Sequence, residues 1–200
     1  MRHKPVGSLS RSLGIALSPK GAKVLNERPY RPGVHGRDRH VLTEYARRLQ
    51  EKQRLRAQYY ISERQLRTAF AAAAKQSGRT GDNLIADLER RLDTVVLRSG
   101  FATSIYEARQ LVSHRHVLVN GERINVPAYR VQDGDYVSIK AKSHGMPVLV
   151  AAREGALLEK TPPYLEVSRE SLTTRVLRSA LREESPVICD VQLVVEYYAR

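Results

Sequence analysis

The chain has 200 residues, and its 34 Lys+Arg against 21 Asp+Glu give a formal net charge of +13 at pH 7. Such a surplus indicates a polyanionic partner, with nucleic acid before any other. A single cysteine, Cys189, excludes an intramolecular disulfide and a cysteine-cluster metal site. No apolar run approaches the ~20 residues of a membrane span, and the N-terminus lacks the apolar core of a signal peptide, so we expect an intracellular protein without a membrane partner.

The positive charge is concentrated at the start of the chain. Residues 1–60 carry 14 Lys+Arg and 4 Asp+Glu, whereas residues 151–200 carry 7 and 8. Residues 1–42 have little apolar periodicity and contain many prolines and glycines, so we predict an extended basic arm that becomes ordered on its partner. Arginine side chains there suit phosphates, and Tyr30 offers a face to a base or ribose. The alternative is a disordered basic tail.

A helix is predicted from Thr43, as its N-cap, to about Tyr59. Its cations face only two acids within the helix, Glu44 and Glu51. RNA contact is therefore one interpretation of this basic face, and a solvated cationic face is the other. The candidates for its packed side are Tyr45, Leu49 and Leu55.

Two more helix starts follow. Ser62 and Gln65 have the spacing of a capping box, and Ile61 and Leu66 that of a hydrophobic staple. Ser77 to Gly81 predicts a break, after which Asp82 is the expected cap of the next helix.

Residues 88–140 predict helices followed by a hairpin. Leu88 to Val96 has helical spacing and Gly100 a stop, while Ser104 and Glu107 start a second helix whose buried stripe is Ala108, Leu111 and Val112. Asn120-Gly121 between Val119 and Ile124 is the strongest short hairpin signal, because both central residues of a type I′ turn need positive φ. Asp133-Gly134 marks another turn before a strand at Tyr136–Ile139.

The remaining residues predict a β extension and a terminal helix. Met146 to Leu158 reads as a short strand and then a helix, and residues 164–167 and 172–177 read as strands. Asp190 is the expected cap of a last helix, Val191–Tyr198. We therefore predict an α+β fold: a basic arm (1–42), a helical domain (43–88) completed by residues 180–200, and an inserted module (89–179) of two helices on a small antiparallel sheet.

Several stretches, in order along the chain, resemble the bacterial small-subunit ribosomal protein S-four family. They are Ser10–Gly14, Arg28–Gly36 (RPYRPGVHG), Glu51–Arg56 (EKQRLR), Glu63–Gln65, Leu88–Asp93, Ala108–Val119 and Val194–Tyr198. The resemblance implies the fold above and no catalytic residue. It also implies a cytoplasmic constituent of the small ribosomal subunit that binds a multi-helix junction of 16S rRNA early in assembly.

Further partners are implied by the same resemblance. They are neighbouring small-subunit proteins, including protein five, and mRNA near the path by which it enters, with an influence on translational accuracy. The alternatives are an accessory RNA-binding protein or the RNA-binding part of an RNA-modifying enzyme. No Gly-rich phosphate loop, serine elbow or metal-ligand set supports an enzyme.

The chain departs from the family pattern at three places. Many members have a metal-binding cysteine cluster in the first third, where this chain has Ser8, Ser10 and Ser12, so we expect no metal and no cofactor. Thr103, Ile105 and Tyr106 replace usual arginines, and Arg115 replaces a glycine at a helix end that favours positive φ. These changes fit a zinc-independent, paralogous copy.

The candidate rRNA-binding residues combine the basic arm, the first long helix and the predicted RNA-facing side of the module. His114 and His116 belong to this set rather than to a metal site, because no third ligand is evident. The full set is Arg11, Arg28, Tyr30, Arg31, His35, Arg37, Arg39, Arg47, Arg48, Lys52, Arg54, Arg56, Arg109, His114, Arg115, His116 and Asn120.

Overall fold

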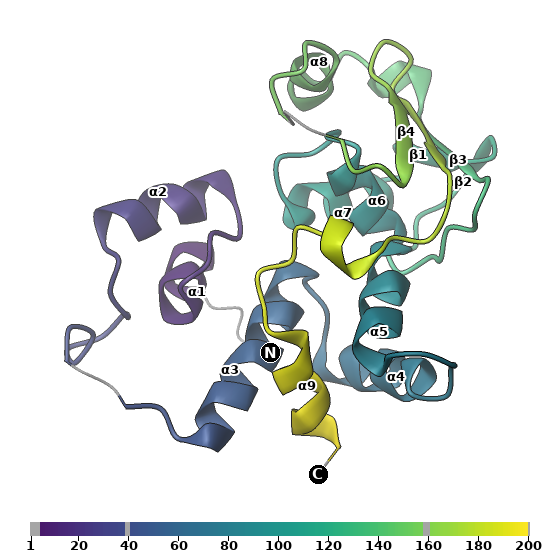
Figure 1. Cartoon of the computed structure of the whole chain (residues 1–200). Helices are drawn as coiled ribbons and strands as arrows, with labels where there is room; N and C mark the ends of the chain where they lie inside the picture. Colours follow the sequence, from purple (N-terminus) through teal and green to yellow (C-terminus); the bar gives the residue numbers. More distant parts are fainter. Residues whose placement is uncertain (1–4, 39–40, 158–160, 200) are drawn as a thin grey trace. The chain divides into compact units, whose positions relative to one another are not determined.

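The structure, a computed structural model, describes residues 5–38, 41–157 and 161–199 (Figure 1). It divides into two compact units, one of residues 1–75 with 187–200 and one of residues 76–186. Helices make up the first unit, and helices with an antiparallel sheet make up the second, which confirms the predicted α+β class. The boundaries differ from those expected, because residues 76–88 and 180–186, which were assigned to the helical domain, belong to the second unit.

The first unit contains five α-helices in its described residues. They are α1 (Val6–Leu13), α2 (Pro19–Glu27), α3 (Glu44–Gln58), α4 (Glu63–Ala73) and α9 (Val191–Tyr198). The predicted caps are present: Thr43 Oγ1 accepts from Ala46 N, Ser62 and Gln65 form both bonds of a capping box, and Asp190 accepts from the first turn of α9. Figure 1 shows α9 beside α3, so the end of the chain completes this helical unit.

Helices α1 and α2 correct the prediction of an arm that is extended throughout. Helix α1 ends at Gly14, whose φ of 69° is the left-handed conformation that glycine tolerates best. Helix α2 begins with Pro19 at its first turn, and Ser18 Oγ accepts from Gly21 N. Within the described part of the predicted arm, the longest stretch without helix is residues 28–38.

Glu63 connects the helices that close the first unit. Its carboxylate accepts hydrogen bonds from Tyr198 Oη (2.8 Å), Lys52 Nζ (3.2 Å) and Arg56 Nη1 (3.3 Å). Burial disfavours its charged form, but the hydrogen bonds outweigh this effect and lower the pKa of Glu63 below its usual value. Residues from α3, α4 and α9 therefore meet at one carboxylate.

The second unit begins with three helices, α5 (Thr80–Glu89), α6 (Leu92–Arg98) and α7 (Ile105–Ser113). Helix α5 starts two residues before Asp82, which lies in its first turn rather than at its cap. The single helix expected over Leu88 to Val96 is wrong, because Arg91 is extended (φ −67°, ψ 138°) and forms an isolated bridge with Arg130.

Within the described residues, the sheet has five antiparallel strands in the order β2-β1-β3-β5-β4. They are β1 (Val117–Val119), β2 (Glu122–Arg123), β3 (Tyr136–Ile139), β4 (Leu165–Ser168) and β5 (Thr173–Val176). Asn120 and Gly121 have φ of 50° and 86°, as the predicted type I′ hairpin requires.

One face of this sheet forms the core of the second unit together with α6 and α7. Buried Val117, Val137 and Ile139 alternate with the exposed or half-buried residues of the same strands. The buried stripe predicted for α7, Ala108, Leu111 and Val112, joins the same cluster. Helix α8 (Pro147–Arg153) stands where a short strand and then a helix were expected, and residues 146–157 contain no strand.

Two buried ion pairs fix the helices of the second unit. Arg91 donates to Asp93 in a bidentate pair (2.9 and 2.6 Å), and both side chains are at most 2% exposed. Burial raises the pKa of Asp93 although Arg91 opposes this change. Arg98 makes a second bidentate pair with buried Glu89, which also accepts from Tyr164 Oη at 2.9 Å. Since an unpaired buried charge is strongly destabilising, each pair holds its elements in a fixed arrangement.

Replacing Glu63 with glutamine should destabilise the first unit at neutral pH. Its lowered pKa means that its contribution is complete above the unfolded value of about 4.3 and is lost as pH falls through the folded pKa. We expect Glu63→Gln to reduce the unfolding free energy by about 1 kcal/mol at neutral pH, a figure discounted because the carboxylate is partly exposed. Urea denaturation measures the unfolding free energies of the wild type and the variant. The difference between these two free energies should become smaller under acidic conditions.

Glu27→Gln is the matched control, because Glu27 is exposed and has no ion pair within the described residues. A pH-independent loss in Glu63→Gln, or an equal loss in the control, would show that the charge of Glu63 is not what connects the three helices.

Candidate RNA-binding surface

Arg11 clamps the non-helical part of the arm against α1. Its Nε donates to the carbonyl oxygens of Arg28 (3.1 Å) and Tyr30 (2.9 Å), and its Nη2 donates to that of Arg31 (3.2 Å). One guanidinium group thus satisfies three carbonyls of a segment that has no helix to satisfy them. Arg11 was predicted to bind RNA, but the structure uses its donors inside the first unit.

The side chain of Tyr30 also contacts Arg11 and a second arginine of the arm, Arg37. The guanidinium carbons of Arg11 and Arg37 lie 4.8 and 4.7 Å from its ring centroid, and Arg37 Nη2 donates to its hydroxyl at 3.5 Å. The hydrogen bond from Arg37 lowers the pKa of Tyr30. The ring predicted to stack on a base or ribose instead stacks with two arginines, which stabilises the course of the arm.

The turn that follows Tyr30 presents its remaining polar side chains to solvent. A Cβ at Gly36 would lie 1.9 Å from the carbonyl oxygen of Arg31, so only glycine fits there. His35 and Asp38 are exposed and pair at 2.8 Å. Arg28 and Arg37 are exposed, and Arg31 is half-buried. Arg39, together with His40 and His3, lies outside the described residues.

Helix α3 keeps most of its predicted RNA-binding cations inside the first unit. Lys52 is only 6% exposed, and its amine lies 4.1 Å from the Tyr197 ring centroid as well as beside Glu63. Arg54 Nε donates to Leu13 O (2.8 Å), which holds α1 on α3, and its Nη1 pairs with Glu51. Both side chains therefore have a structural role, and their contact with RNA stays a prediction.

The other cations of α3 differ in exposure. Arg48 pairs with Glu44 and Glu196, and Arg56 pairs with Glu63, so both also stabilise the helical unit. Arg47 is exposed and has no ion pair within the described residues. It is the cation of this helix that remains for a partner.

The predicted RNA-facing residues of the second unit divide in the same way. Arg109 Nη1 lies 3.8 Å from buried Asp93, His116 Nδ1 bonds Ser143 Oγ (2.8 Å), and Asn120 bridges Asp135 and Tyr136 N. These three side chains hold the local structure. His114 and Arg115 are exposed at the end of α7.

Arg115 has the positive φ that was predicted for its position. Its φ is 62°, and its amide donates to Val112 O as the chain leaves α7. A side chain in this conformation costs about 1 kcal/mol relative to glycine. The strained backbone places a guanidinium group in solvent beside His114.

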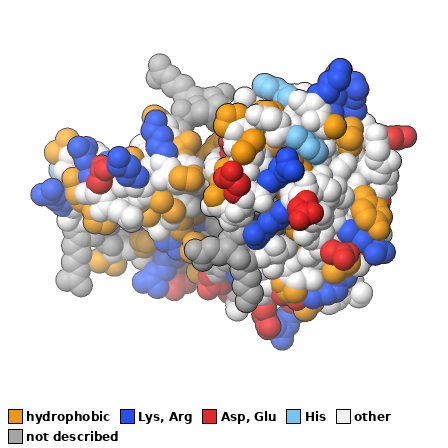
Figure 2. Space-filling model, turned by 90° about the horizontal axis from the view of Figure 1, so that it is seen from above, with side chains coloured by type: hydrophobic (Ala, Val, Ile, Leu, Met, Phe, Trp, Pro, Cys, Tyr) orange, Lys and Arg blue, Asp and Glu red, His pale blue; other side chains and the backbone are white. Residues whose placement is uncertain are grey.

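Several exposed cations were missed by the sequence analysis. They are Lys20 and Lys23 of α2, Arg64 and Arg67 of α4, and Arg123 of β2. Those of α2 were missed because the sequence analysis predicted an extended arm there and no helix. Figure 2 shows one face, on which Lys and Arg side chains are interspersed with acidic and apolar ones rather than forming one continuous patch.

Two features are absent from the described ranges of the chain. These ranges contain no group of three or more His, Cys, Asp or Glu side chains placed to hold a metal ion. They also contain no helix with the length and apolar character that crossing a membrane requires.

Comparison with known proteins matches these features to one family. Residues 1–89 match the sequence profile of the ribosomal protein S4/S9 N-terminal domain, and residues 90–137 match that of the S4 domain. Small ribosomal subunit protein uS4 of Streptomyces avermitilis is 52% identical over 98% of both chains. That of Leifsonia xyli is 54% identical over 95% of this chain and 94% of its own. The chain belongs to the uS4 family.

Membership of the uS4 family confirms the family that the sequence resemblance predicted. It also confirms the expectation that the chain is not an enzyme. It also adds a structural detail. The two profiles meet between residues 89 and 90, whereas the compact units divide between residues 75 and 76. Helix α5 thus belongs to the N-terminal sequence profile but packs with the S4 domain, since Leu84, Ile85 and Leu88 are buried.

Changing Arg11 to lysine should loosen the arm without changing its charge. Lysine cannot reproduce the planar fork that reaches three carbonyls, so we expect residues 28–38 to be cleaved faster in limited proteolysis. Affinity for small-subunit rRNA should fall roughly tenfold. Arg153→Lys is the control, because Arg153 is exposed, lies outside the candidate rRNA-binding set and has no side-chain hydrogen bond or ion pair among the described residues. Unchanged proteolysis and affinity in Arg11→Lys would contradict the clamp.

Arg115 can be tested by two substitutions that separate strain from binding. Arg115→Gly should raise the unfolding free energy by about 0.5–1 kcal/mol, because glycine tolerates positive φ, while weakening rRNA binding. Arg115→Ala should weaken binding without that gain. Thermal unfolding and rRNA titration measure the two effects. A glycine variant that is more stable and binds like the wild type would remove Arg115 from the RNA-binding surface.

Proposed function

We propose that this chain is a structural constituent of the small ribosomal subunit that binds small-subunit rRNA and acts in the cytoplasm as part of that particle. The observation that carries the proposal is the clamped arm, in which Arg11 fixes the backbone so that Arg28 and Arg37 remain exposed. A preordered arm binds more tightly than a flexible one, because less conformational freedom is lost on binding.

The proposed RNA-binding surface has one part in each unit. In the first unit it consists of Arg28, Arg31, His35, Arg37 and Arg47. In the second unit it consists of His114 and Arg115 at the end of α7, with Arg109 contributing less because it also faces Asp93. Folded RNA is recognised largely through phosphates and ribose hydroxyls, and arginine forks suit both groups.

The distribution of charge along the chain supports a more specific proposal for the rRNA target and the neighbouring proteins. We propose that the rRNA target is a multi-helix junction whose binding starts assembly of the subunit body. Residues 151–200, with 7 Lys+Arg and 8 Asp+Glu, are better suited to neighbouring basic proteins, including protein five. A position near the path of incoming mRNA, with an effect on accuracy, completes the proposal.

The salt dependence of rRNA binding tests which cations contact phosphate. Changing Arg28, Arg37 and Arg47 together to glutamine should reduce the log–log salt slope by about 2, since each phosphate contact contributes roughly 0.7–0.9. The matched control changes the equally exposed Lys75, Arg79 and Arg153. Equal slopes in the two triple variants would contradict the assignment. Deleting residues 1–42 is less informative, because it also removes α1 from α3.

Zinc should have no effect on folding or rRNA binding. A tetrahedral structural site needs about four nitrogen or sulfur ligands, and the first third of the chain has no cysteine. We expect the purified protein to contain no stoichiometric zinc by metal analysis and to unfold at the same temperature with a strong chelator present. Its share of purified ribosomes should rise when zinc is scarce. Stoichiometric zinc in the purified protein would contradict the first expectation. Equal abundance of the chain in ribosomes from zinc-rich and zinc-starved cells would contradict the second.

A further inference from the structure

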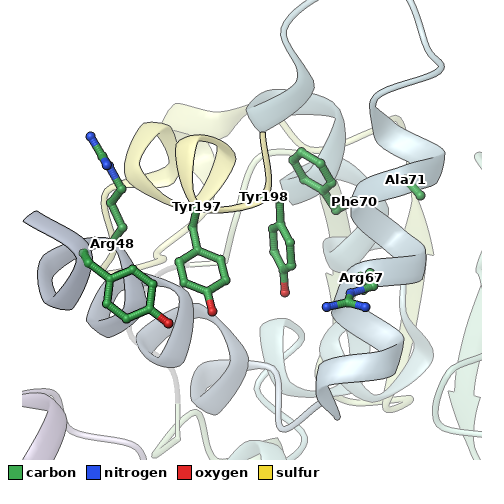
Figure 3. Close-up of a pocket in the computed structure, with 7 residues that line it drawn as sticks. Arg48, Arg67, Phe70, Ala71, Tyr197 and Tyr198 are labelled. Carbon is green, nitrogen blue, oxygen red and sulfur yellow. The ribbon is translucent and has the colours of Figure 1, made fainter. Parts of the chain in front are cut away.

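A cavity of about 480 Å³ lies among α3, α4 and α9 of the first unit (Figure 3). It is separate from the proposed RNA-binding surface, because none of that surface's residues line it. Its volume falls in the range of about 300–1,000 Å³ that is usual for small-ligand sites. The described part of the first unit therefore contains a concave site that the arm and its arginines do not explain.

Aromatic rings form most of the cavity wall. Tyr197 and Tyr198 lie 5.4 Å apart at 89°, Phe70 lies 4.9 Å from Tyr198, and Tyr45 lies 5.9 Å from Tyr197. Tyr45 is 57% exposed, although the sequence analysis placed it on the packed side of α3. Figure 3 shows the rings of Tyr197 and Tyr198 side by side with their hydroxyls directed the same way.

The charges around the cavity leave one cation without compensation. Arg48 pairs with Glu44 and Glu196, and Lys52 pairs with Glu63. Arg67 of α4 is exposed and has no hydrogen bond or ion pair among the described residues. In Figure 3 its guanidinium faces Tyr198. The wall thus combines aromatic faces with a free guanidinium, which suits a planar ring that carries an anionic group.

We propose that this cavity binds one unpaired nucleotide of RNA, with its base against the tyrosine rings and its phosphate on Arg67. The inference rests on the proposed function in that rRNA supplies the nucleotide, and it adds a second contact of a different kind. Bases turned out of a helix are commonly bound by aromatic side chains and arginine. A partner's aromatic side chain would leave Arg67 uncompensated unless a carboxylate accompanied it, whereas a nucleotide carries ring and anion together.

The test is a nuclear magnetic resonance titration of the full chain with tyrosine rings labelled. The probes are uridine and adenosine 5′-monophosphates, with ribose 5-phosphate and uridine as controls that lack the base or the phosphate. We expect nucleotides at millimolar concentration to shift the Tyr45 and Tyr197 signals, and each control to bind more weakly. Tyr45→Leu and Arg67→Ala should weaken nucleotide binding by roughly five- to hundredfold.

Arg64→Ala is the matched control, because Arg64 is an exposed arginine of the same helix that does not line the cavity. It should leave nucleotide binding unchanged. Absence of shifts at Tyr45 and Tyr197, or equal losses in Arg64→Ala and Arg67→Ala, would overturn the proposal. So would shifts caused by a short peptide of glutamate and tyrosine but not by nucleotides, which would indicate a protein partner.

Titration of the same variants with small-subunit rRNA separates this inference from the proposed function. If the chain binds rRNA normally while the cavity ignores nucleotides, only the inference fails. If the wild type does not bind rRNA at all, the proposed function fails, whatever the nucleotides do.

Discussion

Charge compensation inside each unit determines which cations remain available to RNA. Arg11 gives its donors to three carbonyls of the arm, Arg54 holds the end of α1, and Lys52 lies between Glu63 and Tyr197. A contact between these cations and phosphate would compete with the bonds that they make inside the protein. Their pairing, in turn, fixes the elements that carry the exposed arginines. A net charge of +13 therefore overstates the binding surface, since part of it stabilises the protein.

The second unit follows the same principle in a more buried form. The Arg91–Asp93 pair is nearly inaccessible, and Arg98 pairs with the buried carboxylate of Glu89. The main effect of the two pairs is to fix where α5 ends, where α6 begins and how the β4–β5 extension attaches through Tyr164. At the end of α7, Arg115 has a left-handed conformation, and the amides of Arg115 and His116 donate to the carbonyl oxygens of Val112 and Leu111.

Sequence reasoning succeeded where the signal was local. The Ser62–Gln65 capping box, the Asp190 cap and the Asn120-Gly121 hairpin each involve residues a few positions apart, and each is present. It failed where the deciding contact was distant. The break at Arg91 depends on Arg130, and the burial of Lys52 depends on α9, far along the chain. Helices α1 and α2 were missed because they have only eight and nine residues and lie among the prolines and glycines that indicated an extended segment. Which arginines reach solvent could not be read from spacing alone.

Chemical modification of arginines, mapped by mass spectrometry in the free and rRNA-bound protein, tests this division of charge most directly. In the free protein we expect Arg28, Arg37, Arg47 and Arg115 to react readily, and Arg11, Arg54 and Arg91 to react slowly. Binding to rRNA should protect the first group and leave the second unchanged. If Arg11 and Arg54 react as fast as Arg28 in the free protein and become protected only on RNA, they bind phosphate directly and the account is contradicted.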